Sequence, residues 1–430
     1  MSRPPATVTV VCDARGVARA LRMPAYRLRV TRGPAKGLER LTHETRLVIG
    51  RSEGADWQLE DATLSALHCE LLLDFDGLRI RDLGARNGVR LGGRRVVEAW
   101  LEPKDAVTLG ETVLELRLVE GGAEQALPER TSFGRLRGSS LRMRQLYGEL
   151  ERCAGSAATL LLRGETGTGK DLAARAVAET GVRAGKPFVI VDCGCLPAAL
   201  AENELFGHEP GAFSGADQAY VGAFERAQGG TLFLDEVGEL SASVQAKLLG
   251  VLERRALTRL GGTAQVALDV RVIAATHRAL EREVNRGGFR ADLFYRLSVL
   301  TVSLPALREH REDVPELIAG FLAELDGSLP ASLLEQLYQA EYPGNVRELR
   351  AAVERSLVGL PSGMARSEEL PDVDLAEPYA EQKARLLAGF ERAYLRALMA
   401  QVKGNVSEAS RRSGLNRQHL HTLLRKQAEE

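Results

Sequence analysis

The segment "LLLRGETGTGKD" places glycines and a lysine between an apolar run and a helical stretch. Glycines in this order let backbone N–H groups converge on phosphate oxygens at a helix N-terminus, and the lysine adds a positive charge. The pattern predicts a P-loop. A glycine-rich turn without a ligand is the alternative, and the strand, the spacing and the lysine together disfavour it. The loop residues are Gly164, Glu165, Thr166, Gly167, Thr168, Gly169, Lys170 and Asp171.

Two carboxylates follow a second apolar run in "GGTLFLDEVGEL". A serine or threonine usually follows the P-loop lysine and binds magnesium, but Asp171 stands there in this chain. Asp235 is therefore the expected ligand of Mg²⁺, through water, and Glu236 the group that polarises the attacking water. Read alone, the segment is a strand before a solvated acidic turn. Read with the P-loop, it predicts hydrolysis of ATP.

The elements that must position these residues follow from the surrounding pattern. Strand-like runs alternate with helical stretches over 132–358, which indicates a parallel sheet covered by helices, and past Leu304 the pattern is helical. Residues 26–120 alternate short apolar runs with turn signals, as an all-β sandwich does. We therefore expect a multidomain chain with an N-terminal extension (1–25), a sandwich (26–120), a linker (121–131), an α/β domain with a helical subdomain (132–358), a second linker (359–380) and a helical end (381–430).

Composition sets the outer limits on function. The chain has 430 residues, 44% of them hydrophobic and 27% charged, which is typical of a folded multidomain protein. The net charge of −1 means that any nucleic-acid binding must depend on a local basic patch. No apolar run approaches the roughly 18 residues of a membrane span, so we expect a cytoplasmic protein without a membrane partner. The cysteines lack paired spacing, and buried thiols are favoured over a metal site.

Further motifs stand in a fixed order along the α/β region. After the P-loop come "ELFGHEPGAFSGA", "GTLFLDE", "FRADLFYRL" and "YPGNVREL". This order resembles the bacterial sigma-54-dependent transcriptional activators, which are enhancer-binding AAA+ ATPases. The resemblance covers roughly residues 133–358. It implies a loop that touches sigma-54, with Phe213 as the contact aromatic and Ser214 where threonine is usual; the loop residues are Gly211, Ala212, Phe213, Ser214, Gly215 and Ala216.

The same resemblance assigns residues that act between subunits. Arg290 and Arg296 look like arginine fingers, which reach the ATP of a neighbouring subunit and stabilise charge on the transferring phosphoryl group. The family resemblance therefore implies a homo-oligomeric ring, a hexamer or a heptamer. Shown in isolation, these residues would be read as two surface arginines on a helix. Arg347 resembles the second nucleotide sensor, and Thr276 lies at the first.

Two positions depart from the family pattern. His277 follows Thr276 where the family commonly has asparagine. Asp192 stands where an asparagine often restrains the catalytic glutamate, and a carboxylate cannot donate the amide's hydrogen bond unless it is protonated. We therefore expect the coupling of hydrolysis to loop movement to differ in detail.

The β-rich region carries a second set of polar motifs. Its "VIGRSEGADWQLEDATLSALHCEL" and "IRDLGARNGVRLGG" resemble a forkhead-associated (FHA) domain, which binds phosphothreonine peptides. By this resemblance Arg51 pairs with the phosphate, Ser65 donates to it and Asn87 holds the peptide backbone. Ala85 and Arg86 depart from the usual Ser-Thr before Asn-Gly, and the charge of Arg86 allows a further phosphate contact. His68 braces the loops. The alternative is a sandwich that keeps the fold without the ligand.

The C-terminal "GNVSEASRRSGLNRQHLHTLLRKQ" has helix caps and an apolar face typical of a helix-turn-helix. It resembles the Fis-type DNA-binding domain, whose second helix enters the major groove. A helical hairpin used only for dimerisation is the alternative. The residues expected at base edges are Arg417, Gln418 and His421, and those expected at phosphates include Arg411, Arg412 and Arg425.

Together these expectations describe an FHA-regulated activator that binds enhancer DNA and uses ATP and Mg²⁺ to remodel the sigma-54 RNA polymerase holoenzyme. The phosphothreonine protein would come from a Ser/Thr kinase pathway, because no receiver pattern precedes the ATPase. One alternative is a DNA-binding AAA+ regulator that no longer engages sigma-54, which the intact "GAFSGA" loop disfavours. Another is a phosphopeptide-binding scaffold with a silent ATPase, which Glu236 and the two arginines disfavour.

Overall fold

The computed structural model describes residues 8–13, 15–214 and 216–359, together with residues 398, 399, 409, 411 and 412. The chain divides into two units, Met1–Ser362 and Gly363–Glu430. In the second unit the few described residues are helical. The expected second linker (359–380) therefore lies outside the described residues except for Gly359, and so does most of the expected helix-turn-helix.

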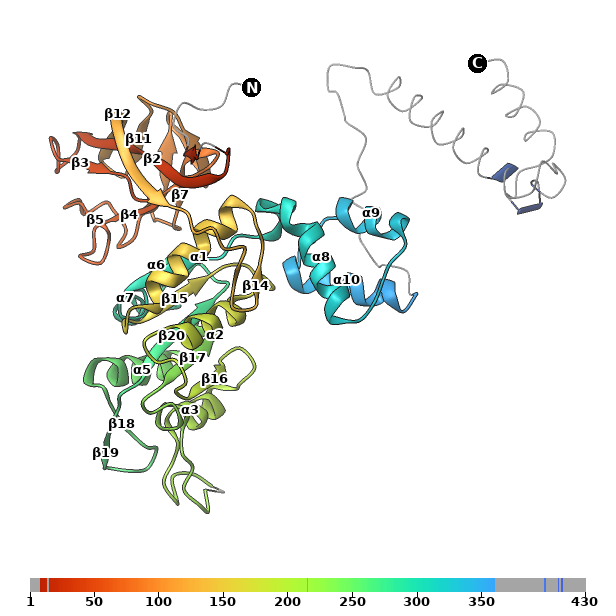
Figure 1. The fold of residues 1–430 in the computed structure, drawn as a ribbon. Coiled ribbons are helices and arrows are strands. Elements are labelled where there is room, and N and C mark those ends of the chain that lie inside the picture. Colours follow the sequence, from red (N-terminus) through yellow and green to blue (C-terminus); the bar gives the residue numbers. More distant parts are fainter. Residues whose placement is uncertain are drawn as a thin grey trace. The chain divides into compact units, whose positions relative to one another are not determined.

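The first part of unit Met1–Ser362 is a sandwich of two antiparallel-rich sheets, here called the β-domain (Figure 1). One sheet has the order β1-β2-β12-β11-β8-β9, with β3 beside β2, and the other has the order β10-β7-β6-β4-β5. The all-β prediction is confirmed. The strands are β1 (Thr9–Cys12), β2 (Ala18–Arg32), β3 (Glu39–Thr42), β4 (Arg46–Gly50), β5 (Trp57–Gln58), β6 (Cys69–Asp74), β7 (Gly77–Asp82), β8 (Val89–Leu91), β9 (Arg94–Val96), β10 (Glu98–Leu101), β11 (Ala106–Leu109) and β12 (Thr112–Ala126).

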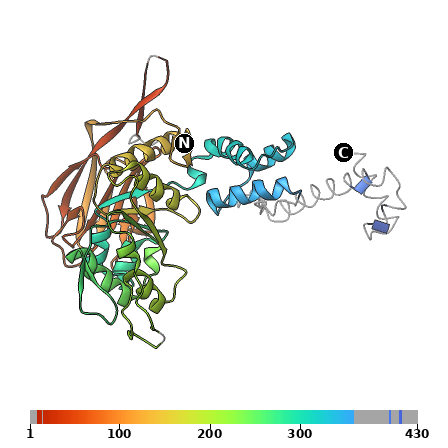
Figure 2. The same ribbon diagram turned by 60° about the horizontal axis from the view of Figure 1, so that its bottom comes forward.

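Two stretches expected to lie outside the sandwich belong to it. The expected extension (1–25) contains β1 and the first part of β2, which form the red hairpin that projects in Figure 2. The expected linker (121–131) begins inside β12, where Gly122 pairs with Pro24 and Ala126 with Ala20. Backbone hydrogen bonds to a partner strand about 100 residues away hold this stretch, although its side chains have no apolar alternation.

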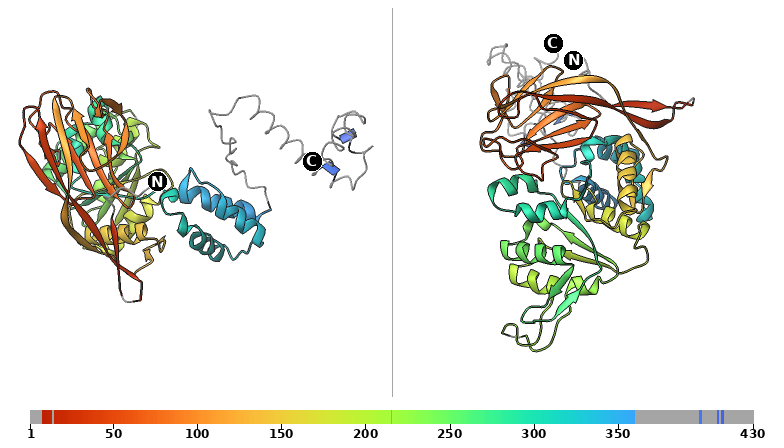
Figure 3. Two further views of the ribbon diagram at one scale, coloured as in Figure 1. Left: turned by 90° about the horizontal axis from the view of Figure 1, so that it is seen from above. Right: turned by 90° about the vertical axis from the view of Figure 1, so that its left-hand side faces the viewer.

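The second part of the unit, here called the α/β-domain, is built on a parallel sheet of order β16-β17-β20-β15-β21, as the alternating pattern predicts. Helices cover both faces of this sheet (Figure 3). The strands are β13 (Ser132–Phe133), β14 (Leu136–Arg137), β15 (Leu160–Arg163), β16 (Phe188–Asp192), β17 (Thr231–Asp235), β18 (Ala256–Thr258), β19 (Gln265–Ala267), β20 (Arg271–Thr276) and β21 (Leu300–Ser303). The helices are α1 (Leu141–Ala154), α2 (Lys170–Thr180), α3 (Ala198–Phe206), α4 (Ala223–Arg226), α5 (Ala242–Arg254), α6 (Leu280–Arg286) and α7 (Ala291–Leu297), with a 3₁₀ turn at Val237–Glu239.

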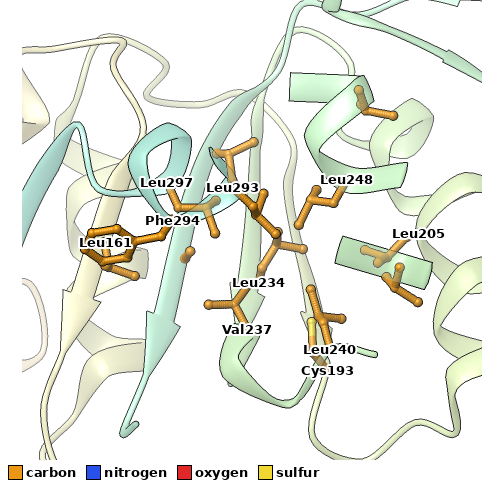
Figure 4. Close-up of a cluster of buried hydrophobic side chains, with 14 of the residues drawn as sticks. Leu161, Cys193, Leu205, Leu234, Val237, Leu240, Leu248, Leu293, Phe294 and Leu297 are labelled. Carbon is orange, nitrogen blue, oxygen red and sulfur yellow. The ribbon is translucent and has the colours of Figure 1, made fainter. Parts of the chain in front are cut away.

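Apolar side chains fill the space between the sheet and its helices. On one face Leu234 of β17 lies in a buried cluster with Leu248 of α5 and Leu293 of α7 (Figure 4). On the other face Leu160 and Ile273 pack against helices α1 and α2. Because strands buried on both faces need apolar residues throughout, β15, β17 and β20 read as continuous apolar runs in the sequence. Polar groups are thereby confined to the strand ends.

A small helical subdomain, here called the lid, follows β21 and confirms the helical pattern past Leu304. It contains 3₁₀ turns at Leu307–Glu309 and Arg311–Asp313 and the helices α8 (Val314–Glu324), α9 (Ala331–Gln339) and α10 (Asn345–Leu357). Among the described residues, no helix has both the length and the apolar character needed to span a bilayer.

Candidate functional site

The P-loop connects β15 directly to α2, as its spacing predicts. Gly167 has φ of 83° and lies so close to the lid that a Cβ atom there would be 2.2 Å from the carbonyl oxygen of Gly344. The Lys170 side chain is buried, and its Nζ donates to the carbonyl oxygens of Gly164 at 3.0 Å and Glu165 at 3.2 Å. The lysine therefore points back across the loop, where it can meet a phosphate.

The two acidic residues lie at the carboxyl end of β17, beside this loop. Lys170 Nζ is 3.7 Å from Glu236 Oε1. Burial and the neighbouring Glu236 carboxylate raise the pKa of Asp235 above its usual value. An opposing positive charge would offset this penalty, which suits a carboxylate that helps to bind a cation. The structure thus brings together Lys170, Asp235 and Glu236.

The carboxylate of Glu236 is held by His277 and not by Asp192. His277 Nδ1 lies 2.7 Å from Glu236 Oε2, and the His277 backbone N–H donates to the same oxygen at 3.1 Å. Asp192 instead accepts from the backbone N–H of Gly194 at 2.9 Å and from Cys195 Sγ at 3.0 Å. Asp192 sits opposite Asp235 in the sheet register, but its side chain is used by its own loop. Asp192 occupies the position expected to restrain the glutamate, but His277 is the residue that contacts it.

The two expected sensor positions flank the same site. Thr276 is buried at the end of β20, and its hydroxyl accepts from the Arg278 backbone N–H at 3.0 Å. The backbone N–H of Arg347, in the first turn of α10, donates to the carbonyl oxygen of Gly167 at 3.3 Å. This contact joins the lid to the P-loop, while the Arg347 side chain is exposed.

Asn345 is a residue of this site that the sequence reasoning missed. It is buried, has φ of 58°, and its Oδ1 accepts from the Leu307 backbone N–H at 2.8 Å. Its Nδ2 donates to Glu165 Oε2 and to the Thr166 carbonyl, both at 3.1 Å. Glu165 also pairs with Arg308, which holds the pKa of Glu165 at about 2. The asparagine of "YPGNVREL" was the available signal, because asparagine tolerates the left-handed backbone better than most residues.

Arg290 and Arg296 bracket helix α7. Arg290 precedes the helix and pairs with Asp292, with 2.7 Å between Nη2 and Oδ2. Arg296 Nη2 donates to the carbonyl oxygen of Leu252 at 3.1 Å. Both side chains are therefore at the surface of their own domain and bonded locally.

The "GAFSGA" segment lies in the loop between α3 and α4, at the lower end of its domain in Figure 1. Gly211 donates its backbone N–H to the Ala216 carbonyl at 2.8 Å, which closes the loop. Phe213 packs edge-on against His208 at a ring distance of 4.9 Å, yet remains 48% exposed. An aromatic ring this exposed on a loop tip is available for contact with another molecule. Gly215 lies outside the described residues.

Three loops of the β-domain bring its expected ligand residues together. Ser65 accepts at its carbonyl from the Arg51 backbone N–H at 3.0 Å, and its hydroxyl accepts from the Arg86 backbone N–H at 3.0 Å. Asn87 Nδ2 donates to the Thr63 carbonyl at 2.7 Å.

His68 is buried and bridges the loops through Ser65 N at 3.2 Å and the Gly88 carbonyl at 3.1 Å. Burial lowers the pKa of His68, which suits this bracing position.

Two of the six expected DNA-contact residues lie among the described residues. Arg411 and Arg412 are helical and exposed in the second unit. The other four, Arg417, Gln418, His421 and Arg425, lie outside the described residues.

Comparisons with known proteins match both parts of the first unit, and one match runs on into the second unit. Residues 136–303 match the family model described as "Sigma-54 interaction domain", and residues 308–387 match "AAA+ ATPase lid domain". Residues 29–120 match "Inner membrane component of T3SS, cytoplasmic domain".

Curated relatives resemble the chain over most of its length. Transcriptional regulatory protein ZraR of Salmonella typhi is 41% identical over 340 residues, which are 76% of each chain. The acetoin dehydrogenase operon transcriptional activator AcoR of Bacillus subtilis is 41% identical over 336 residues, 75% of this chain and 55% of the relative. Among solved structures, NtrX from Brucella abortus in complex with ADP superimposes with a TM-score of 0.52 at 34% identity, covering 68% of this chain and 69% of that one.

Proposed function

The chain belongs to the family of sigma-54-dependent transcriptional activators, and from this premise we propose that it hydrolyses ATP as a ring to remodel the sigma-54 RNA polymerase holoenzyme. Enhancer DNA would bind at the C-terminal helix-turn-helix, and a phosphothreonine protein at the β-domain. The observation that carries this proposal is the convergence of Lys170, Asp235 and Glu236 at the carboxyl ends of β15 and β17.

The residues present fit ATP and Mg²⁺. The P-loop places a helix N-terminus and a buried lysine at one point, which suits phosphate oxygens. Asp235, whose pKa burial raises, would hold Mg²⁺ through water, and the ion would neutralise phosphate charge. Lys170 would move from the carbonyl oxygens of its own loop to the phosphates. Binding of a nucleotide by NtrX supports the same site in this chain.

Glu236 is the group that would orient the attacking water, and His277 is its positioning residue. The two hydrogen bonds from His277 leave Glu236 Oε1 facing Lys170, on the phosphate side. Asp192, where the family pattern has the restraining asparagine, contributes nothing to this orientation. The histidine thus replaces the asparagine in fixing the carboxylate.

We expect His277→Ala to lower kcat for ATP hydrolysis by up to about 100-fold, because a misplaced base loses productive geometry. The KM for ATP should change little, since His277 contacts the glutamate and not the P-loop. His277→Asn should restore part of the rate through its amide, and Asp192→Asn is the matched control at wild-type rate. Steady-state phosphate release measures all four proteins. An unchanged rate in His277→Ala would contradict this positioning role.

Contact with sigma-54 is assigned to the "GAFSGA" loop. Phe213 offers an exposed ring at the tip, and Ser214 keeps the hydroxyl of the usual threonine while losing its methyl group. A single exposed aromatic can dominate the energy of such an interface. The loop lies between α3 and α4, on the same polypeptide that carries the nucleotide site.

The experiment that tests this proposal is native-gel binding of the full chain to sigma-54 with ADP-aluminium fluoride, which mimics the hydrolysis transition state. We expect a trapped complex that Phe213→Ala weakens by about 30-fold or more. Val221→Ala, an exposed apolar residue beyond the loop, is the matched control and should leave the complex intact. No complex despite ATPase activity would favour a regulator that no longer engages sigma-54.

The β-domain is proposed to bind phosphothreonine. Arg51, Ser65 and Asn87 lie on adjoining loops, and hydrogen bonds through Ser65 tie Arg51 to Arg86. Guanidinium and hydroxyl groups together are the usual ligands of a phosphate monoester. The proposal for DNA rests on the sequence resemblance of residues 381–430.

A further inference from the structure

The loops that carry the residues expected to bind phosphothreonine also contact the α/β-domain. Tyr295 of α7 lies on the β4–β5 loop, where its hydroxyl donates to Ser52 Oγ at 2.9 Å. A Cβ atom on Gly54 would lie 2.0 Å from the Tyr295 ring, so the contact leaves no room for a side chain there. Ser52 directly follows Arg51, the expected phosphate ligand. The β4–β5 loop therefore carries an expected phosphate ligand and also contacts α7.

Helix α6 makes a matching contact with the other two loops. Asn285 Nδ2 donates to the carbonyl oxygens of Leu67 at 2.6 Å and Leu83 at 2.9 Å. The Leu67 and Leu83 side chains are buried in the same apolar cluster as Leu293 of α7. Leu67 is two residues after Ser65, and Leu83 is four residues before Asn87. A single amide on the α/β-domain thus joins the two loops that hold these expected ligand residues.

Charges of both domains are interleaved and buried beside these contacts. Glu70 of the β-domain and Glu281 of α6 are each 1% exposed. Arg46 of the β-domain pairs with both glutamates, and Arg163 pairs with Glu281 at 2.8 Å and reaches Glu70 at 4.0 Å. Burial by itself would raise the pKa of Glu70, but the arginines around the carboxylate outweigh this effect and bring its pKa below the usual value. Removing one partner of such a cluster leaves an uncompensated buried charge, so the cluster favours one docked geometry.

We propose that the β-domain docks on α6 and α7 as a restraint on the arginine-finger segment, and that a phosphothreonine peptide releases it. This inference rests on the proposed function. The docked β-domain contacts both the strand that leads into the P-loop and the helix that carries Arg296. Arg163 is the last residue before the P-loop, and Tyr295 lies next to Arg296 on α7. In this proposal, ligand at one edge of the shared loops opposes docking at the other, and such an opposition is reciprocal.

Gly54→Val in the full chain tests the restraint, because the added side chain must displace the Tyr295 ring. Glu53→Val, in the same exposed loop, is the matched control. We expect Gly54→Val to speed amide hydrogen exchange over residues 280–297 and to raise ATP turnover by about fivefold. Asn285→Ala should do the same through α6, which keeps the test open if the first variant folds poorly. Unchanged exchange, or faster exchange without faster turnover, would overturn the restraint.

A second arm separates this inference from phosphothreonine binding itself. Wild-type chain is mixed with a degenerate phosphothreonine peptide library or with its unphosphorylated counterpart. We expect the phosphorylated library alone to bind and to speed exchange over residues 280–297. Equal binding of both libraries would reject the ligand proposed for the β-domain, while the Gly54→Val result would still decide docking. Selective binding with unchanged exchange would keep the ligand and reject the release.

Discussion

Glu236→Gln is expected to lower kcat for ATP hydrolysis by about 10²- to 10⁴-fold, the usual contribution of a general base. The amide keeps the size of the side chain and can still bond to His277, but it cannot accept a proton from the attacking water. ATP affinity should be retained, because Glu236 lies beside the Lys170 side chain but is not part of the P-loop. Phosphate release at saturating ATP and titration with a fluorescent nucleotide measure the two quantities.

Glu239→Gln is the control for this substitution. Glu239 is exposed three residues along the chain and pairs with Arg278 at 2.5 Å, so its loss should leave turnover near the wild-type rate. A Glu236→Gln protein with more than about a tenth of wild-type activity would move the role of base to another carboxylate. An inactive wild-type chain would favour the scaffold with a silent ATPase.

Arg290→Ala and Arg296→Ala are each expected to lower kcat by about 10³- to 10⁵-fold, as loss of an arginine finger does. ATP binding within the subunit should persist. Both side chains lie at the surface of their own domain, where Arg290 bonds to Asp292 and Arg296 to the Leu252 carbonyl, and action on a neighbouring subunit stays a prediction. Arg286→Ala is the control, since Arg286 is exposed on α6 and pairs only loosely, at 3.7 Å, with Glu283.

Mixing subunits distinguishes action between subunits from action within one. Arg290→Ala subunits keep Glu236, and Glu236→Gln subunits keep Arg290, so a mixed ring contains some complete sites. We expect ATP turnover to pass through a maximum near equal proportions at constant total protein. A mixture as inactive as its components at every ratio, with ring formation verified by sedimentation, would contradict action between subunits.

The arrangement of the candidate nucleotide site was predictable because its parts are local in sequence. A P-loop needs a strand, a glycine-rich turn and a helix in immediate succession, and "LLLRGETGTGKD" contains all of them. Asp235 and Glu236 follow from the same logic, because carboxyl ends of parallel strands meet at one edge of the sheet. The order of the motifs also indicated the family to which the chain belongs.

Contacts between distant segments were not predictable. Which residue holds Glu236 depends on the reach of side chains from two strand ends, so His277 and not Asp192 makes the contact. Asn345 joins the lid to the P-loop across about 180 residues. The outer part of β12 was taken for a linker because strand pairing with β2 depends on backbone hydrogen bonds more than on its own side chains.

By itself, therefore, the sequence determined the local chemistry of this protein: the phosphate loop, the acidic strand end, the exposed aromatic loop and the alternation that builds a sandwich and a parallel sheet. Only the tertiary structure decided which distant residues each of these segments contacts. Periodicity and motif spacing report which face of an element is buried, but not which distant surface buries it. The contacts of Ser52 and Gly54 with α7, and of Glu70 with Arg163 of β15, depend on that distant surface.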